Sequence, residues 1–431
     1  MLPPLSPTIY HLHSLVTGMD FKDTGWILDA PGEEKQSLLQ SVYEKQQLLV
    51  REENFGLYKF ADWMPVKRLL NGSSPPITYR SEKLSSYLGL KNLYVTFSGW
   101  WPEKGAMMKT CSFKETEAYT VCARLAEDSG KVLVVASAGN TARAFARVCS
   151  DNNIPLLLCI PEDNLDALWF DEKISDCVKV IATRTGSDYF DAIHLSNMVC
   201  KLEKFQLEGG AKNIARRDGM ATTVLSAITT IGRIPAYYFQ AVGSGTGAIA
   251  AWEANKRFLQ DGRFGEQKMK LMVSQNAPFL PLYHAWKAGS RDLLPLDDDL
   301  ARRHVKEICA KVLSNRKPPY SLAGGLFDAL TDSGGDVLLV PNKEAFAAGE
   351  LFLEMEGIDL HPAAAVAAAS LINACREKKV KKDAVIMLNI TGGGEERFKN
   401  DRQLYYLKPT VIFDINPSLE EVDSKVDTLF D

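Results

Sequence analysis

Three glycine-bearing turns in this chain each follow an apolar run that predicts a strand, and each could bind an anion. The sharpest is Gly243-Ser244-Gly245-Thr246-Gly247, between the predicted strand 237–242 and a helix that begins near Ala248. Glycines let the backbone approach a ligand closely, and the free N–H groups at the start of the next helix attract negative charge. The turn therefore predicts a phosphate site. A turn without a ligand is the alternative, although three glycines cost stability.

A dinucleotide is a weaker candidate for that phosphate ligand. The run matches the loose Gly-x-Gly-x-x-Gly/Ala pattern, which expects an acidic residue about 20 positions later to hold a ribose. Here the next predicted strand ends in Ser274-Gln275-Asn276, which is more distant and not acidic. The chain also contains no Gly-x-x-x-x-Gly-Lys-Ser/Thr motif, so a nucleotide-binding P-loop has no support.

A second turn, Ser137-Ala138-Gly139-Asn140-Thr141, opens a helix after the predicted strand 131–136. Its serine, threonine and backbone N–H groups could bind a carboxylate, and the amide of Asn140 could donate to a phenolate-like oxygen. Simple capping of the helix by Ser137 or Asn140 is the alternative.

A third turn, Thr391-Gly392-Gly393-Gly394, follows the predicted strand 384–390. It puts the hydroxyl of Thr391 at the carboxyl end of that strand, where ligands of open α/β sheets bind. An ordinary glycine-rich loop is the alternative.

A lysine lies upstream of all three turns, in Ser112-Phe113-Lys114 at the start of a predicted helix over 114–128. A desolvated lysine has a lowered pKa and becomes a nucleophilic amine. Taken alone, a solvated lysine at a helix start is the simpler interpretation.

Short apolar strands alternate with helices through most of the chain, and these elements must position the turns. This alternation is typical of parallel sheets covered by helices on both faces. The strands are too many for one small sheet, so we expect a two-lobed α/β fold. Strands are predicted over 131–136, 155–160, 178–183, 237–242, 271–274, 337–340 and 384–390, with helices over 114–128, 188–202, 343–355 and 362–374.

Turn signals suggest where the domains begin and end. The NGSSPP run at 71–76 ends an N-terminal extension over residues 1–75, in which one amphipathic helix is predicted over 35–51. A large α/β domain is expected over 76–125 and 205–431, and a small α/β domain over 126–204.

The composition excludes several classes of protein. The 431 residues are 46% apolar and 24% charged, which excludes a wholly disordered chain. Lysine plus arginine is 50 and aspartate plus glutamate is 54, a formal charge of −4 without a long basic run, so nucleic acid is not expected as a partner. No apolar stretch reaches the ~18 residues of a membrane helix, and the N-terminus does not resemble a secretory signal. The eight cysteines form no Cys-x-x-Cys pair and predict buried thiols in a reducing cytoplasm.

In this order, the four motifs resemble those of the fold-type II pyridoxal-phosphate enzymes, which include threonine synthase, cysteine synthase and tryptophan synthase β. The resemblance is closer still to the cysteate synthases, which are relatives of threonine synthase. It covers roughly residues 60–400 and is carried by the stretches GWWPEKGAMMKTCSFKETEAY, ASAGNTARAFA, EGGAKNIARRDGMAT, YFQAVGSGTGAIAAWEA, NRKPPYSLAGGLFDAL, GIDLHPAAAVAAASL and LNITGGG.

The resemblance implies a role for each motif. Lys114 would form the Schiff base with pyridoxal 5'-phosphate and act as the catalytic residue. Asn140 would hold the phenolic oxygen of this cofactor, and Thr391 would face its pyridine nitrogen. The turn at 137–141 would bind the carboxylate of the substrate. The cradle for the cofactor phosphate would consist of Gly243, Ser244, Gly245, Thr246 and Gly247.

The implied reaction is a β-replacement that converts O-phospho-L-serine and sulfite to L-cysteate and phosphate. Among enzymes, the alternatives are threonine synthase acting on O-phosphohomoserine and another O-phosphoserine-dependent β-replacement with sulfide or a thiol. Outside enzymes, the alternative is a protein that binds the cofactor without turnover. The expected partners are therefore small molecules, with neither nucleic acid nor membrane, and we expect a homo-oligomer in the cytoplasm.

Both the leaving group and the nucleophile of this reaction are oxyanions, so the site needs cationic or hydroxyl donors beyond the cofactor cradle. Lys109, five residues before Lys114, is the preferred ligand. One of the adjacent residues Arg216 and Arg217 must face elsewhere. The further substrate-binding candidates are Ser137, Ala138, Gly139, Thr141, Arg143, Lys212 and Arg216.

Two features depart from the family pattern. The family often begins with a Cys-x-x-Cys-Gly zinc knuckle, but Ser14 and Thr17 occupy the cysteine positions here, so no metal site is expected. Threonine synthases usually have aspartate after the Schiff-base lysine. This chain has Glu115, which argues against a plain threonine synthase.

Overall fold

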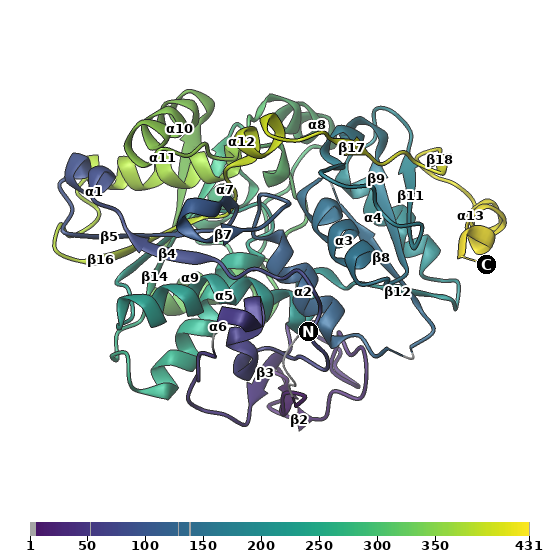
Figure 1. Cartoon of the computed structure of the whole chain (residues 1–431), viewed down its shortest axis with the longest axis horizontal. Helices are drawn as coiled ribbons and strands as arrows, with labels where there is room; N and C mark the ends of the chain where they lie inside the picture. The colour runs from purple at the N-terminus through teal and green to yellow at the C-terminus, as the bar shows by residue number, and fades with distance from the viewer. Residues whose placement is uncertain (1–5, 52, 128, 138, 431) are drawn as a thin grey trace.

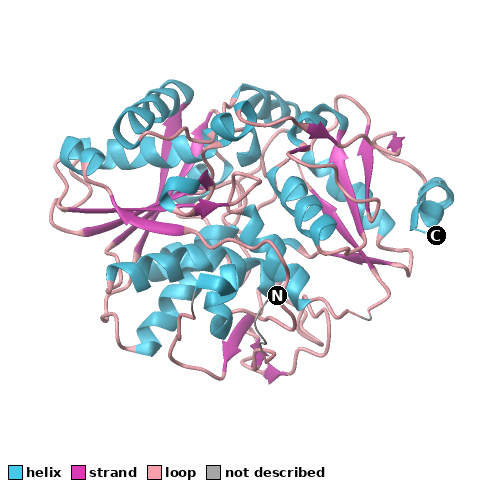
Figure 2. Cartoon of the chain, in the orientation of Figure 1, coloured by secondary structure: helices cyan, strands magenta, loops and turns pink. Residues whose placement is uncertain are grey.

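Two β-sheets, each the centre of its own lobe, form the framework of the molecule (Figures 1 and 2). The computed structural model describes residues 6–51, 53–127, 129–137 and 139–430. Both sheets are built mainly from parallel strands, as the alternation of strands and helices predicts. The two-lobed α/β prediction is therefore confirmed.

The larger sheet has six strands and helices on both faces. Only its edge pair is antiparallel, at β4 and β5. The helices α10 (Asn342–Glu356) and α11 (Pro362–Arg376) cover one face, and α5 (Ile214–Ile231), α6 (Thr246–Asp261) and α9 (Leu326–Ser333) cover the other (Figure 1). In spatial order the strands are β15 (Asp336–Pro341), β14 (Lys270–Ala277), β13 (Tyr237–Ala241), β16 (Val385–Ile390), β5 (Asn92–Phe97) and β4 (Ile77–Arg80).

The smaller sheet has five parallel strands. Side chains on one face pack against α4 (Tyr189–Val199) and α13 (Leu419–Val426), and those on the other face pack toward α3 (Asn140–Asp151). In spatial order its strands are β12 (Phe205–Leu207), β8 (Val132–Ala136), β9 (Leu156–Pro161), β11 (Val178–Thr183) and β18 (Val411–Phe413).

Two segments that the sequence placed in the large domain pair instead with the smaller sheet. Strand β12 lies beside β8, and β18, close to the C-terminus, lies beside β11. Each is only three residues long, and so short an apolar run does not indicate which sheet it joins.

All seven predicted strands are present, with ends that differ by a few residues. The predicted helices correspond to α2 (Lys114–Arg124), α4, α10 and α11. The sequence analysis missed β4, β5 and the long buried helix α5. Helix α5 is buried along most of its length, so it lacks the one-sided apolar pattern that marks a surface helix.

The N-terminal extension forms a small antiparallel sheet, and the helix predicted over 35–51 is wrong. The sheet pairs β1 (Tyr10–His13) with β2 (Asp20–Phe21) and with β3 (Gln40–Tyr43). Within β3, Ser41 and Tyr43 both donate to the buried carboxylate of Asp218, at 2.5 and 2.6 Å. Because this contact repeats every second residue, it fits a strand and overrides the helical pattern.

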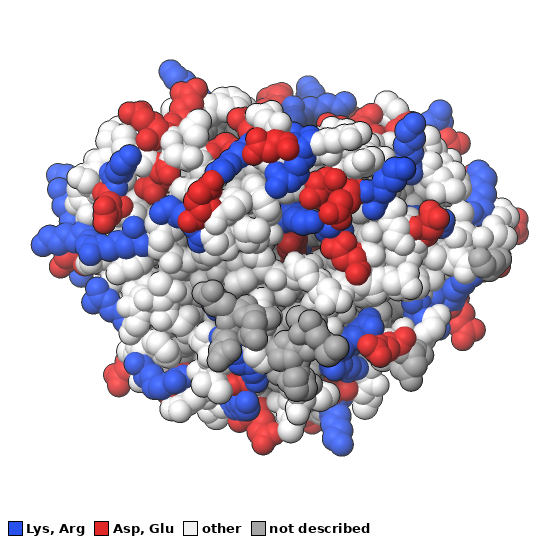
Figure 3. All heavy atoms as spheres, in the orientation of Figure 1, with Lys and Arg blue, Asp and Glu red and all other residues white. Residues whose placement is uncertain are grey.

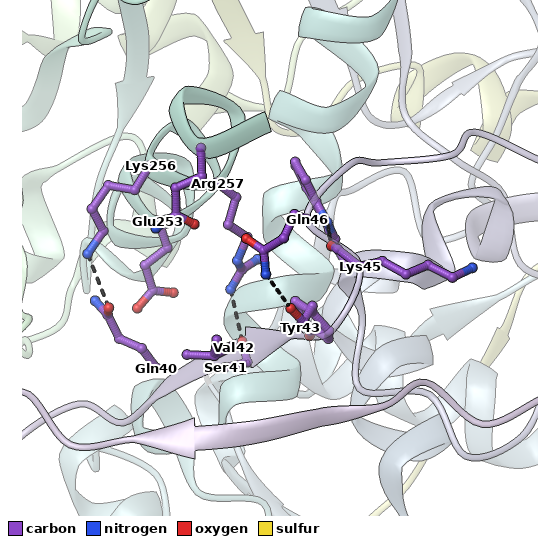
Figure 4. Close-up of a pocket in the computed structure, with 11 residues that line it drawn as sticks. Gln40, Ser41, Val42, Tyr43, Lys45, Gln46, Glu253, Lys256 and Arg257 are labelled. Atoms are coloured by element: carbon purple, nitrogen blue, oxygen red, sulfur yellow. Dashed lines mark hydrogen bonds between the residues drawn. The ribbon is translucent and has the colours of Figure 1, made fainter. Parts of the chain in front are cut away.

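A small cavity of about 140 Å³ lies between β3 and α6 (Figure 4). Lys256 of α6 donates to the side chain of Gln40 at 3.1 Å, and Arg257 donates to Ser41 at 2.9 Å. Arg257 also donates to Asp218 at 2.6 Å. These bonds tie the N-terminal extension to α6, the helix that begins in the glycine-rich turn 243–247.

The surface charges, the lengths of the helices and the state of the cysteines can be compared with what the composition predicts. Basic and acidic side chains are mixed over the face shown in Figure 3. Within the described residues, no helix is long and apolar enough to span a membrane. All eight cysteines are free thiols, four of them buried. Trp100 and Trp101 are both buried, against Phe398 and against Tyr79 and Phe97 respectively.

Candidate active site

The sequence motifs meet in one enclosed cavity between the lobes. The turn after β13, the residue after β16 and the start of α2 all line it. The structure thus brings together residues separated by more than 270 positions, because the carboxyl ends of parallel strands share one edge of a sheet. The motif residues that line this cavity are Lys114, Asn140, Gly243, Ser244, Gly245, Thr246, Gly247 and Thr391.

The glycine-rich turn has no room for side chains at its glycines. Gly245 has φ +79°, and a Cβ there would lie 2.8 Å from the side chain of Leu326. A Cβ on Gly247 would lie 2.6 Å from Gln240. Helix α6 starts at Thr246, so its free N–H groups and the positive end of its dipole face the cavity. This arrangement suits a phosphate group.

Lys114 begins α2 and carries an amine at the wall of the cavity. Its side chain is 21% exposed, and its Nζ lies 3.2 Å from Oε2 of Glu117. Burial lowers the pKa of Lys114 and outweighs the opposing effect of Glu117, which favours the charged form. A lysine in this state is a ready nucleophile and proton acceptor.

Glu117 is the centre of a buried charge cluster that the sequence analysis did not single out. It is fully buried and accepts a hydrogen bond from Thr141 Oγ1 at 2.9 Å. Arg216 lies 3.6 Å from it and makes a bidentate pair with Glu208 at 2.9 and 2.6 Å. The charges of Lys114, Glu117, Arg216 and Glu208 cancel, and such pairing offsets the cost of burying them.

Asn140 is the first residue of α3, and Arg143 holds its side chain. Its amide lies 3.5 Å from Nε2 of His361, and its Oδ1 accepts a hydrogen bond from Arg143 at 3.0 Å. Burial lowers the pKa of His361 to about 4, so this ring is neutral at physiological pH. The amide of Asn140 is therefore oriented before any ligand arrives.

Arg143 does not have the free guanidinium that a substrate ligand requires. It donates to the backbone oxygens of Thr110 and Ala167 and lies 3.3 Å from Glu395. It also stacks over the ring of Trp169, 4.2 Å from the centroid. The prediction that Arg143 binds substrate is therefore corrected. Arg143 instead positions the side chain of Asn140.

The turn before α3 supplies part of the cavity wall. Ser137 Oγ accepts hydrogen bonds from the N–H groups of Gly139 and Ala142, both at 3.0 Å, so Ser137 caps the helix. Ser137, Gly139 and Thr141 all line a larger cavity next to Lys114. Ala138, which was also predicted to bind substrate, lies outside the described residues.

Lys109, the preferred anion ligand, lies away from Lys114 and lines none of the cavities around it. Its Nζ lies 3.5 Å from Asp171 and 3.4 Å from Glu172, which already satisfy its charge. These ion pairs argue against Lys109 as the anion ligand, and its role in substrate binding stays a prediction. Arg217 is the member of its pair that faces elsewhere, since it is bound to Glu253 of α6 at 3.0 Å.

Two larger cavities adjoin the enclosed one and meet at Gly139 and Asn140. The first, about 520 Å³, is lined by Lys114, Lys212 and Arg216 among others. The second, about 510 Å³, is lined by His361, Arg143 and Glu395 among others. Of the two, only the first has Lys114 in its lining.

Comparison with known proteins agrees with this geometry. Residues 102–392 match the family model described as "Pyridoxal-phosphate dependent enzyme". The chain is 47% identical to the cysteate synthase of Methanosarcina acetivorans over 380 residues, which are 88% of this chain and 91% of that protein. It is 40% identical to the cysteate synthase of Methanospirillum hungatei over 419 residues, 97% of this chain and 98% of the relative.

This chain belongs to the cysteate synthase family of pyridoxal-phosphate dependent enzymes.

Solved structures of other members of the wider group share its fold. Maize serine racemase matches with a TM-score of 0.55 and 16% identity, over 74% of this chain and 89% of that chain. Threonine deaminase from Solanum lycopersicum matches with a TM-score of 0.51 and 19% identity, over 76% and 87%. These neighbours establish the fold-type II architecture.

The enclosed cavity fits the cofactor of this family. Gly245 has a positive φ that side chains rarely adopt, and a Cβ on Gly247 would displace the side chain of Gln240, so the turn favours glycine where the backbone would surround a phosphate. A partly desolvated lysine and a preoriented amide lie on the same cavity. Thr391, 8% exposed, adds a neutral hydroxyl to the lining. This donor set matches the phosphate, aldehyde and ring oxygen of pyridoxal phosphate.

Sequence reasoning missed His361 although its stretch carried the resemblance to this cysteate synthase family. His361 precedes Pro362 at the start of α11, where its Nδ1 accepts a hydrogen bond from the N–H of Ala363. The alanine-rich run that follows indicates only a packed helix. A histidine directly before a proline at a helix start is the one signal that could have found it.

Ser14 and Thr17, which occupy the positions where the family often has zinc-binding cysteines, take part in hydrogen bonds here. Ser14 Oγ donates to Glu33 at 2.5 Å and accepts from the N–H of Thr17 at 3.1 Å. In the residues that the structure describes, no group of three or more His, Cys, Asp or Glu side chains is arranged to hold a metal ion.

Proposed function

We propose that this chain catalyses a pyridoxal-phosphate-dependent β-replacement that converts O-phospho-L-serine and sulfite to L-cysteate and phosphate. The observation that carries the proposal is the identity of 40–47% to cysteate synthases over most of both chains. The cavity geometry supports it, because a lysine amine and a phosphate cradle face the same space.

Each residue on the cavity would hold one part of the cofactor. The N–H groups of residues 243–247 would bind its phosphate, and Lys114 would link to its aldehyde carbon. Asn140 would donate to its phenolic oxygen, and Thr391 would meet the ring nitrogen as a neutral hydroxyl. When bound, the cofactor supplies an electron sink for the negative charge that develops at Cα of the substrate.

Lys114 would act as the base in this reaction. Once the amino group of the substrate has displaced it, its amine takes the proton from Cα and later returns a proton there. The Cβ–O bond to phosphate breaks and a Cβ–S bond to sulfite forms, so phosphate leaves as sulfite enters. Glu117 would keep the Lys114 amine in place during these steps, and the N–H groups of Asn140 and Thr141 at the start of α3 would orient the substrate carboxylate.

The partners and the cellular location that we propose follow from the reaction and from the free thiols. The partners are small molecules, and neither nucleic acid nor membrane is required. Eight free thiols suit a reducing compartment, so we place the enzyme in the cytoplasm. We also propose that the enzyme is a homo-oligomer.

The proposal is tested by incubating the cofactor-loaded enzyme with O-phosphoserine and sulfite and measuring cysteate and phosphate. Equal amounts of both products are expected. Parallel reactions replace sulfite with sulfide or a thiol, or replace O-phosphoserine with O-phosphohomoserine. Threonine formation without cysteate would overturn the proposal, as would a product only with sulfide. Absence of any product from a coloured enzyme would favour a binding protein without turnover.

A further inference from the structure

The larger cavity beside Lys114 is lined by basic residues and by no acidic ones. Four cationic side chains and no aspartate or glutamate occur among the described residues that line it. The neighbouring 510 Å³ cavity contains four acidic side chains beside its basic ones. A cationic wall of this kind favours an anionic ligand. The four cations are Lys114, Lys212, Arg216 and Lys317.

Three of these four cations are already paired with carboxylates. Lys114 pairs with Glu117 at 3.2 Å, Arg216 with Glu208 at 2.6 Å, and Lys212 with Asp29 at 2.6 Å. An ion pair must be broken or shared before such a cation can bind a ligand, which reduces the gain. Arg216 is the least available, since its guanidinium is held by two carboxylates at once.

Lys317 is the exception. Lys317 is exposed, and across the part of the chain that the structure describes no carboxylate lies within ion-pair distance of its Nζ. Its Nζ lies over the ring of Phe190, 4.7 Å from the centroid. Phe190 belongs to α4 of the smaller lobe, so this contact joins Lys317 to that lobe. Its charge is therefore available to a ligand.

Two polar neighbours of Lys317 line the same cavity. Asn315 Oδ1 accepts a hydrogen bond from the N–H of Lys317 at 2.9 Å, which leaves the amide Nδ2 of Asn315 as a donor. Ser314 adds a hydroxyl. An ammonium, an amide N–H and a hydroxyl on one short segment are the donor types that bind an oxyanion.

The segment that carries these donors is anchored on both sides. Arg316, between Asn315 and Lys317, pairs with Asp188 at 3.0 Å and with Asp298 at 3.0 Å. Two prolines follow at 318–319, and Tyr320 then donates to the backbone oxygen of Ser290 at 2.9 Å. A donor set on an anchored backbone binds with less loss of conformational entropy.

We propose that Ser314, Asn315 and Lys317 form the subsite that binds the dianionic oxyanion of the reaction, with Lys317 as the principal ligand. The oxyanion is either the phosphate ester of the amino acid substrate or the incoming sulfite. This inference rests on the proposed function only for the identity of the anion. The subsite itself follows from the cavity charges.

The direct test measures the acetylation rate of Lys317 by acetic anhydride in the cofactor-loaded enzyme, with peptide mass spectrometry as the readout. Sulfate, an inert dianion, is expected to slow acetylation at Lys317 about tenfold near saturation, because a bound ion covers the amine. Lys306, an exposed lysine that lines the neighbouring cavity, is the matched control and should react at an unchanged rate. Equal rates at Lys317 with and without sulfate would overturn the subsite.

The kinetic test separates the two sources of the oxyanion. Lys317→Ala is expected to raise KM about tenfold or more for O-phosphoserine or for sulfite, with a smaller change in kcat, whereas Lys306→Ala leaves both constants unchanged. The substrate whose KM rises is the one that the subsite holds. Unchanged KM for both, in an enzyme that still makes cysteate, refutes the subsite and leaves the proposed function intact. Sulfate protection of Lys317 without any cysteate refutes the function and supports the subsite.

Discussion

The two large cavities that meet at Asn140 are nearly equal in volume but differ in their charges. The cavity beside Lys114 has four cations and no acidic side chain among its described lining residues. The cavity beside His361 mixes both signs, and several of its charges pair with one another, such as Arg143 with Glu395 and Arg302 with Asp188. Three of the four cations of the first cavity pair with carboxylates outside its lining, which leaves Lys317 for an anion. The second cavity contains both members of its ion pairs.

This contrast shows that an arginine or lysine near a site is not by itself an anion ligand. Arg143 and Arg216 were both predicted to bind substrate, and both are held by carboxylates, half-buried Glu395 and buried Glu208. A cation binds a substrate anion well only when no carboxylate of the protein already pairs with it, because a paired cation offers little additional binding energy. Four predictions test this contrast, beginning with the change of largest effect.

Lys114→Ala should remove the chemistry of the cationic cavity altogether. Without the amine, the cofactor has no covalent anchor and Cα has no base, so turnover should fall by about 1,000-fold or more. The visible absorbance of the bound cofactor should disappear as well. Spectra and initial rates check both, with Lys306→Ala as a control that keeps them. A variant that retained both colour and turnover would show that another residue carries the role.

Glu117→Gln should disturb the pairing within the cationic cavity. Glu117 favours the charged form of Lys114, so its loss should lower the pKa of Lys114 further. The neutral amine then persists to lower pH, and the midpoint of cofactor capture by unloaded enzyme should move to lower pH. We expect turnover to fall roughly 10- to 100-fold, as for loss of a hydrogen bond to a charged group.

The control for this measurement is Glu115→Gln. Glu115 lies on the same helix but accepts from the N–H of Thr110 and not from Lys114. Its substitution should leave the midpoint of capture in place. A shift of equal size in both variants would indicate a general loss of structure.

His361→Asn should change the pH dependence of the mixed-charge cavity. The pKa of His361 is about 4 in the folded chain, against an ordinary value of 6.5 for an unfolded one. As the pH falls, the unfolded chain therefore binds a proton at this ring before the folded chain does. The neutral ring therefore contributes stability above pH 6.5 that is lost progressively toward pH 4, about 3 kcal/mol in all. His361→Asn should remove this contribution to the dependence of stability on pH.

Urea midpoints at pH 7 and pH 5 check the prediction for His361. The exposed His284 provides the control, and His284→Asn should keep the slope of the original chain. If His361→Asn leaves the slope unchanged, the ring is not neutral in the folded protein.

Lys109→Ala should have the smallest effect, although sequence reasoning made it the preferred anion ligand. Its amine is 38% exposed and is already paired with Asp171 and Glu172 outside the cavities around Lys114. Exposed pairs of this kind contribute about 0–1 kcal/mol, so stability and KM for both substrates should stay nearly constant. A marked rise in KM would return Lys109 to the anion site and weaken the contrast between the cavities.

The sequence by itself determined the two-lobed architecture and the motifs that meet at the cofactor cavity, although not its whole lining, since His361 was missed. Parallel strands covered on both faces must be apolar, and a phosphate cradle must be glycine-rich, so both leave local patterns in the chain. The turns at 137–141, 243–247 and 391–394 were therefore found without coordinates, and so was Lys114. The helix predicted over 35–51 failed because its contacts with Asp218 come from a distant segment.

Only the tertiary structure decided which charges are available. The pairings of Arg216 with Glu208, of Lys212 with Asp29 and of Arg143 with Glu395 join different elements of the fold. No local pattern reveals whether a lysine meets a carboxylate or an empty cavity, since charged residues look alike in sequence wherever they fold. For that reason the sequence favoured Lys109, and the fold instead leaves Lys317 without a carboxylate partner among the described residues.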